Sequence, residues 1–141
     1  MVDADLVTAK LADLRARIAR VRAHCPASPS ELASDQDALD LVSFNLLLAV
    51  QACLDVASHV IAAEAWEPAQ TLAGAFRRLG EHGVLEPSTV EALADAAGLR
   101  NVVAHGYAGV DPGQIHRAAK DGLGDLERFA TQVARWLLAR R

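Results

Sequence analysis

Residues 39–61 read LDLVSFNLLLAVQACLDVASHVI, and this long apolar stretch decides the fold. Its apolar side chains recur at helical spacing, and around residues 46–50 they cover more than one stripe of the helix surface. A helix that is apolar on several faces packs against several neighbours. Asp35 and Asp37 supply a cap and acidic residues for a first turn. The sequence therefore predicts a central helix from about residue 35 to about residue 64, surrounded by other helices.

The N-terminal segment carries an amphipathic pattern of its own. Its apolar residues are spaced alternately four and three apart, at Val7, Leu11, Leu14, Ile18 and Val21. This spacing is typical of a helix that packs along a neighbour through one seam. Pro26 and Pro29 follow, and because proline cannot continue a helix they predict a break at this point.

Three further helices are expected after the central one. Pro68 suits the first position of a helix, and Pro87 lies at the start of the next, which Gly98 is expected to interrupt or bend. Residues 111–113, Asp-Pro-Gly, predict a turn or cap before the last helix, which keeps one face apolar. Gly122 lowers helix propensity within that last segment and predicts close packing or a bend there.

The composition favours helices over strands. Hydrophobic residues make up 52% of the chain but aromatic residues only 4%, and alanine and leucine dominate. Alanine and leucine lead the helix-propensity scale, whereas the aromatic residues that favour strands are scarce. A chain of 141 residues is long enough to bury one core. We therefore predict an all-α, single-domain bundle of about five helices spanning residues 1–141.

Net charge and the pattern of apolar residues limit the partners and the location. The formal net charge is −4, whereas a protein that grips nucleic acid with its whole surface is usually basic. Any RNA contact must therefore be local, or be made by an assembly. No apolar run is expected to cross a membrane, because Gln51 and Asp55 follow the most apolar part, and the N-terminus lacks the order of a signal peptide. Cys25 and Cys53 show no metal-type or disulfide spacing and are expected to be small apolar residues. We predict a cytoplasmic protein without a membrane partner.

Residues 99–107, LRNVVAHGY, hold the main candidates for chemistry. Arg100 carries a permanent charge in a planar fork that fits phosphate. His105 can give or take a proton near neutral pH. Tyr107 adds a hydroxyl group two residues later. Together these three groups indicate phosphodiester chemistry.

The spacing of the motif has two geometric outcomes. In an unbroken helix Tyr107 falls within about 20° of Arg100, and His105 lies about 140° away from Arg100. Gly106 favours a helix end at Ala104 or His105, since glycine is common just past a helix terminus. His105 is then expected to leave helical register. A site of Arg100 and His105 forms at that terminus, or two copies of the motif meet across a dimer.

RNA cleavage without a metal needs a general base, a general acid and a cation. His105 suits either proton role, and Arg100 suits the stabilisation of charge on phosphorus. Asn101 is expected to orient the phosphate. One histidine cannot easily fill both proton roles, so a second contributor is expected. No local cluster of carboxylates and histidines resembles a metal site, so we expect metal independence.

The same residues also have structural interpretations. Arg100 can be a helix-surface arginine paired with Asp95 or Asp55, and the helix dipole alone favours a histidine near a C-terminus. An arginine and a histidine at this spacing also occur together by accident. The chemical interpretation therefore needs support beyond the spacing.

The pattern R-x4-H-x-Y, formed by Arg100, His105 and Tyr107, resembles the signature of the HEPN superfamily, specifically its HepT-type toxins. Residues 49–59 also resemble the second helix of that family. The resemblance covers most of the chain and is weakest over the first thirty residues.

This resemblance implies a ribonuclease toxin of a type VII-like toxin–antitoxin pair, acting as a homodimer whose two motifs face one cleft. Arg100 and His105 carry over as the ribonuclease pair, and Asn101 takes the polar position after the arginine. Tyr107 carries over as the hydroxyl that a nucleotidyltransferase antitoxin of the MNT type adenylylates with ATP. The toxin itself is expected to need no cofactor.

Asp55 resembles a polar position of the family's second helix. It either steers Arg100 or His105 as a substrate-positioning residue or forms a structural ion pair. Two other functions remain open for the chain as a whole: a catalytically inactive helical scaffold, or a nucleotide-binding partner of a nucleotidyltransferase.

Overall fold

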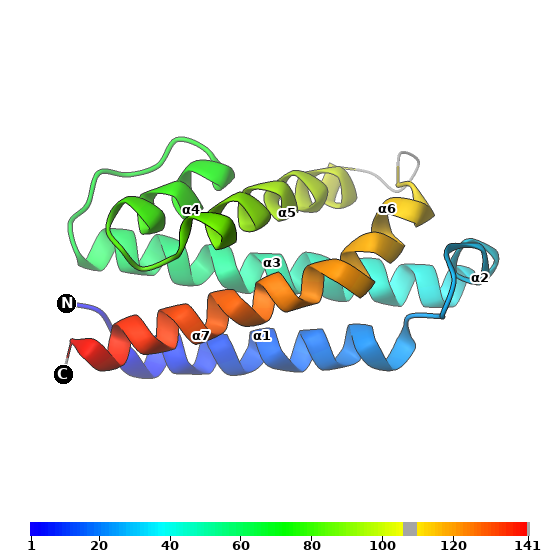
Figure 1. Ribbon diagram of the computed structural model, residues 1–141, viewed down its shortest axis with the longest axis horizontal. Helices are drawn as coiled ribbons and strands as arrows, with labels where there is room; N and C mark the ends of the chain where they lie inside the picture. The colour runs from blue at the N-terminus through cyan, green and yellow to red at the C-terminus, as the bar shows by residue number, and fades with distance from the viewer. Residues whose placement is uncertain (106–109, 141) are drawn as a thin grey trace.

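The computed structural model describes residues 1–105 and 110–140, which are helical with short connections and contain no strand. The helices are α1 (Ala4–His24), α2 (Pro29–Ser34), α3 (Gln36–Ala63), α4 (Leu72–Glu81), α5 (Pro87–His105), α6 (Pro112–Arg117), the π-helical η2 (Ala118–Gly122) and α7 (Leu123–Ala139). Figure 1 shows α6, η2 and α7 as one bent helical run. The predicted all-α bundle is confirmed, with the short α2 as an addition to the expected helices.

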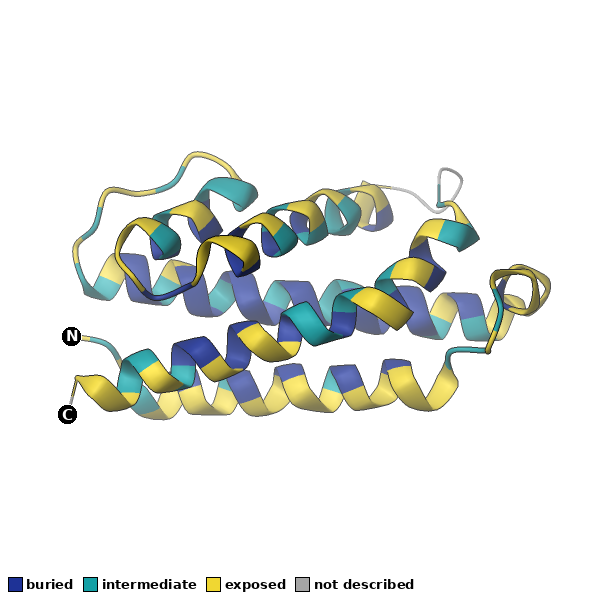
Figure 2. Ribbon diagram, viewed as in Figure 1, coloured by how far each residue is buried: buried dark blue, intermediate teal, exposed yellow. Residues whose placement is uncertain are grey.

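The central helix α3 organises the bundle. It contacts α1 along its length and also packs against α4, α5 and α7. Its buried residues lie on several faces, as Figure 2 shows by the dark blue on α3. The apolar seam of α1 is buried as the spacing predicted, from Val7 to Val21. The backbone N–H of Asp3 donates to His59 Nε2 over 2.9 Å, which ties the start of α1 to α3.

Local hydrogen bonds set several helix ends differently from the sequence prediction. Pro29 occupies the first turn of α2 and Ser28 caps it, so the proline begins a helix as well as following one. Helix α4 starts at Leu72 because the Thr71 hydroxyl accepts from the Gly74 N–H over 2.9 Å. The prediction that Pro68 opens this helix is therefore wrong, because the cap at Thr71 leaves Pro68 in the connection before the helix.

The glycine predictions had different outcomes. Helix α5 runs through Gly98 without interruption, so of the two expected outcomes, an interruption or a bend, the interruption is wrong. Gly98 is exposed and a side chain there would meet nothing within 4 Å, so its only cost is helix propensity. Gly122 ends the π-helical turn between α6 and α7, where the run bends. The Asp111 side chain caps α6 and accepts from the Gly113 N–H over 2.9 Å, as predicted.

Helix α3 is long and apolar enough to cross a membrane by length and composition alone, with a mean hydropathy of 1.8 over 18 residues. Gln51 and Asp55 lie within this helix, and by composition alone they do not exclude such a span, contrary to expectation. Within the bundle 56% of that window is buried. The apolar side chains of α3 therefore pack in the protein core, as a central helix requires.

Candidate functional site

The candidate residues lie on the last turns of α5, where that helix crosses α3. Val103 is buried and Leu99 packs on the core, so this part of α5 is held by apolar contacts. At the other end of α5, the buried Gln132 of α7 accepts from the Glu86 N–H and donates to the Thr89 hydroxyl, both over 2.9 Å. The helix is thus fixed at both ends against α3 and α7.

Arg100 is half-buried and its guanidinium is oriented by two side-chain amides. One nitrogen donates to Gln51 Oε1 over 2.9 Å and another donates to Asn101 Oδ1 over 3.3 Å. The Nε atom is buried and has no hydrogen-bond partner among the described residues. These contacts use two of the five N–H donors of a guanidinium, so Arg100 keeps donors for an anion.

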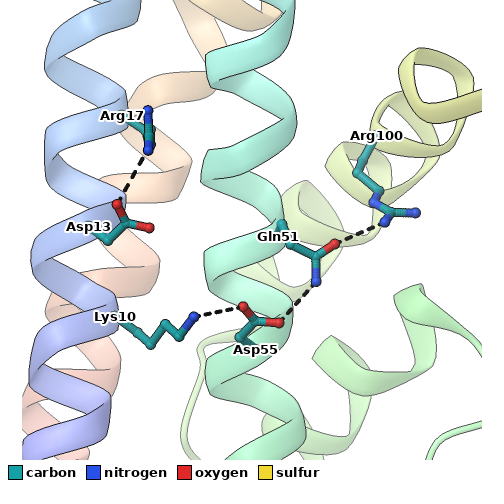
Figure 3. Close-up of polar contacts among 6 residues, drawn as sticks. All are labelled: Lys10, Asp13, Arg17, Gln51, Asp55 and Arg100. Carbon is teal, nitrogen blue, oxygen red and sulfur yellow. Dashed lines mark hydrogen bonds and ion pairs between the residues drawn. The ribbon is translucent and has the colours of Figure 1, made fainter.

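The contact with Gln51 continues into a chain of polar groups on α3 and α1 (Figure 3). Gln51 Nε2 donates to Asp55 Oδ1 over 2.9 Å, and Lys10 Nζ donates to Asp55 Oδ2 over 3.0 Å. Asp55 therefore forms an ion pair with Lys10 and reaches Arg100 through Gln51. Among the described residues, none of the ion pairs includes Arg100.

Two residues of this series of polar contacts, Gln51 and Lys10, were not predicted as site residues from the sequence. The signal for Gln51 was available, because Gln51 and Asp55 lie four residues apart on one face of a helix. The contribution of Lys10 depends on the packing of α1 against α3, which no local spacing encodes.

His105 is the exposed last residue of α5 and is still helical. The helix ends at one of the two expected positions, but the expectation that His105 leaves helical register is wrong. His105 is part of the helix, so helical geometry sets the direction of its side chain. Arg100 and His105 consequently lie about 140° apart around the helix axis.

The two side chains border two different cavities. Arg100 lines a cavity of about 420 Å³ between α3, α5 and the α6–α7 run, which also carries Asp95, Asp121 and Asp125. His105 lines a cavity of about 690 Å³ between α3, α4 and α5, together with Asn101. Asn101 thus touches Arg100 and shares the cavity of His105, so it connects the two candidates. One protomer does not bring the guanidinium and the imidazole to a single cavity.

The predicted AMP acceptor, Tyr107, lies outside the described residues. The site geometry described above therefore includes Arg100 and His105 but not Tyr107.

Three other histidines have structural contacts. His59 accepts from the Asp3 N–H, as described above, and the buried His116 donates from Nε2 to the Pro26 carbonyl over 3.0 Å. The ring of His82 stacks on Trp66 with 3.8 Å between centroids. These contacts give His59, His116 and His82 structural roles.

The two cysteines are free thiols. Complete burial raises the pKa of Cys53. Partial burial raises the pKa of Cys25, and the nearby Lys120 ammonium acts in the opposite direction. Raised pKa values disfavour the thiolate that a reactive or metal-binding cysteine needs. Within residues 1–105 and 110–140, no three His, Cys, Asp or Glu side chains are grouped as a metal site would require.

Comparison with known proteins places these features in a family. A family model described as ribonuclease HepT-like matches residues 14–133. A tRNA nuclease HepT from Aphanizomenon flos-aquae (strain 2012/KM1/D3) is 29% identical over 99 residues, covering 70% of this chain and 67% of that protein. An mRNA nuclease HepT from Shewanella oneidensis is 24% identical over 125 residues, covering 89% and 93%.

A solved structure shows the same fold. The tri-AMPylated Shewanella oneidensis HEPN toxin in complex with MNT antitoxin superimposes with a TM-score of 0.86 and 22% identity, over 94% of this chain and 99% of that chain.

Proposed function

The chain belongs to the ribonuclease HepT-like family, and on that premise we propose that it is a metal-independent endoribonuclease and the toxin of a toxin–antitoxin pair in the cytoplasm. The observation that carries the proposal is the fixed orientation of the Arg100 guanidinium. Two amide side chains fix its guanidinium at a cavity edge, and the exposed His105 lies on the same short stretch of helix. A fixed cation and an accessible imidazole on one short stretch of helix supply two of the parts that phosphodiester cleavage needs.

The proposed reaction uses the ribose 2′-hydroxyl as nucleophile. A base takes its proton, the 2′-oxygen bonds to phosphorus, and the bond from phosphorus to the 5′-oxygen breaks as an acid protonates that oxygen. The His105 side chains of two protomers act as the base and the acid, and Arg100 stabilises the added negative charge on the phosphoryl oxygens. Asn101 orients the phosphate next to both. The products are a 2′,3′-cyclic phosphate and a free 5′-hydroxyl.

A homodimer completes this arrangement. One protomer holds one His105 and directs it about 140° away from Arg100, so a second copy supplies both the second imidazole and the convergence of the groups. An exposed aromatic side chain supports this assembly. Phe44 is 54% exposed and lies two turns before Gln51 on the same face of α3. A large apolar side chain exposed on the face of α3 that also carries Gln51 is suited to contact with a second protomer.

The proposal predicts how single substitutions affect RNA cleavage by the purified protein in EDTA. Arg100→Ala and His105→Ala should each reduce the rate at least about 100-fold, because each removes a group that acts in the transition state. His24→Ala is the matched control, since His24 is exposed on α1 and lines neither cavity. Product ends are identified by mass spectrometry.

A wild-type cleavage rate of the His105→Ala protein would refute the proposed role of His105. Absence of RNA cleavage by the wild-type protein would refute the nuclease assignment. It would favour the alternative of a catalytically inactive scaffold or nucleotide-binding partner, with which the net charge of −4 is compatible. Loss of cleavage in EDTA, restored by a divalent cation, would contradict metal independence.

We also propose that a nucleotidyltransferase antitoxin silences the protein by transferring AMP from ATP to Tyr107. The tri-AMPylated state of the Shewanella toxin, bound to its MNT antitoxin, supports this proposal. Added nucleotide brings negative charge and bulk close in sequence to His105, where an RNA phosphate has to bind.

Co-expression with a cognate nucleotidyltransferase of the MNT type should add AMP-sized increments to its intact mass and relieve growth arrest. Tyr107→Phe should abolish the increments while leaving RNA cleavage intact. Modification that persists in Tyr107→Phe would place the acceptor elsewhere.

A further inference from the structure

The cavity that His105 borders has a second end, which the proposed reaction does not use. It extends from His105 and Asn101 on α5, past α3, to the connection between α3 and α4, where Trp66 lines it. With a volume of about 690 Å³ it has the size of pockets that hold small ligands. A group bound there lies directly beside the proposed proton-transfer residue.

Trp66 is held in place at this end of the cavity. One ring face stacks on His82 with the planes 5° apart, and its edge meets Trp136 with 6.2 Å between centroids. Its backbone N–H donates to the Ile61 carbonyl over 3.0 Å. Arg78 Nε donates to the Glu67 carbonyl over 2.8 Å, which fixes the next residue of the connection. A half-buried indole in a fixed orientation offers a stacking surface at little entropic cost.

The polarity of the two cavities beside α5 differs in a way that matters for RNA. The Arg100 cavity carries charges of both signs, since three aspartates line it together with Arg100 and Arg117. None of the described residues that line the His105 cavity is acidic. Its polar members include Asn101, Gln70 and Ser58, whose amides and hydroxyl can pair with base edges. The rest of its lining is largely apolar, as a flat aromatic base requires.

We propose that this cavity is a subsite for one unpaired RNA base next to the scissile phosphate, with Trp66 as the stacking residue and Gln70 as a hydrogen-bonding residue. Proteins read unpaired RNA by stacking bases on aromatic side chains and pairing with their edges. The inference rests on the proposed ribonuclease function for the neighbouring phosphate. It assigns recognition of the substrate to α3, α4 and their connection, and leaves the chemistry on α5.

Tryptophan fluorescence tests the subsite directly. The chain has two tryptophans, so Trp136→Phe leaves Trp66 as the single reporter and keeps an aromatic ring against it. The probe is a single-stranded 2′-O-methyl tetranucleotide of mixed sequence, which cannot be cleaved because its 2′-oxygens are blocked. Saturable quenching in Trp136→Phe is expected. Trp66→Leu should weaken probe binding at least about fivefold, which corresponds to the lower end of the free energy lost with one base stack. Binding is measured by the fluorescence anisotropy of a labelled probe.

A second variant keeps the test valid if Trp66→Leu destabilises the protein. Ala62 is exposed on α3 and lines the cavity, so Ala62→Leu fills the subsite without disturbing the core. Ala12→Leu, at an exposed position of α1, is its matched control. Ala62→Leu should weaken probe binding at least about fivefold, and Ala12→Leu should leave it unchanged.

The outcomes separate this inference from the proposed function. If the protein cleaves RNA but the probe does not quench Trp66 fluorescence and Ala62→Leu binds the probe as the wild type does, the subsite is overturned and the nuclease is not. Saturable quenching without cleavage supports the subsite and overturns the nuclease. If Ala62→Leu instead disrupts association with a second copy or with the antitoxin while probe binding is unchanged, the cavity is a protein-docking site and the inference is wrong.

Discussion

Arg100 depends on a neighbour that makes no contact with substrate in the proposed reaction. Gln51 accepts from the guanidinium and donates to Asp55, whose other oxygen is paired with Lys10. Each link therefore restricts the next. A guanidinium held in one orientation loses less freedom when it binds phosphate than a free one does. Gln51 is accordingly a positioning residue.

Gln51→Leu should lower kcat about tenfold with little change in KM, because the lost hydrogen bond to a charged group is worth about 1.5 kcal/mol or more. The melting temperature should change little, since Gln51 is half-buried. Gln36→Leu is a matched control. Gln36 makes the same type of bond, to Asp40 over 2.7 Å, at the start of α3. Equal kcat values for the two variants would show that Gln51 has no role in positioning Arg100.

At the scale of the helix, sequence patterns predicted the elements whose stability comes from a long apolar face. The seam of α1 and the multi-faced core of α3 are both buried as expected. The start of α4 was wrong because a single hydroxyl, that of Thr71, decided it. An interruption at Gly98, one of the two outcomes expected there, was wrong because the contacts of the surrounding helix outweigh a propensity cost of about 1 kcal/mol.

The candidate site was predictable to a lesser degree, and for a related reason. Arg100 and Asn101 stand next to each other in sequence and do contact each other. The link from Arg100 to Gln51 spans 49 residues, and that from Lys10 to Asp55 spans 45, so both exist only after the helices pack. The separation of Arg100 and His105 into two cavities follows from helical geometry, but it became evident only once α5 was seen to include His105.

At the scale of the whole molecule, the exposed Phe44 links the fold to the proposed dimer. It is one of few large apolar side chains that the described part of the chain leaves exposed, and it shares a face of α3 with Gln51. Burying a phenylalanine contributes about 1.5–3 kcal/mol, whereas burying an unpaired carboxylate is strongly unfavourable.

Phe44→Glu should therefore weaken dimerisation at least tenfold and reduce RNA cleavage in parallel, while the melting temperature of the monomer stays close to that of the wild type. Light scattering coupled to size-exclusion chromatography measures the assembly state. Leu138→Glu is the control, because Leu138 is 64% exposed near the end of α7, on a different helix from Phe44 and Gln51. Cleavage should recover as the concentration of Phe44→Glu protein rises, since mass action restores the dimer. An active monomer, or an inactive dimer, would break the proposed connection between assembly and catalysis.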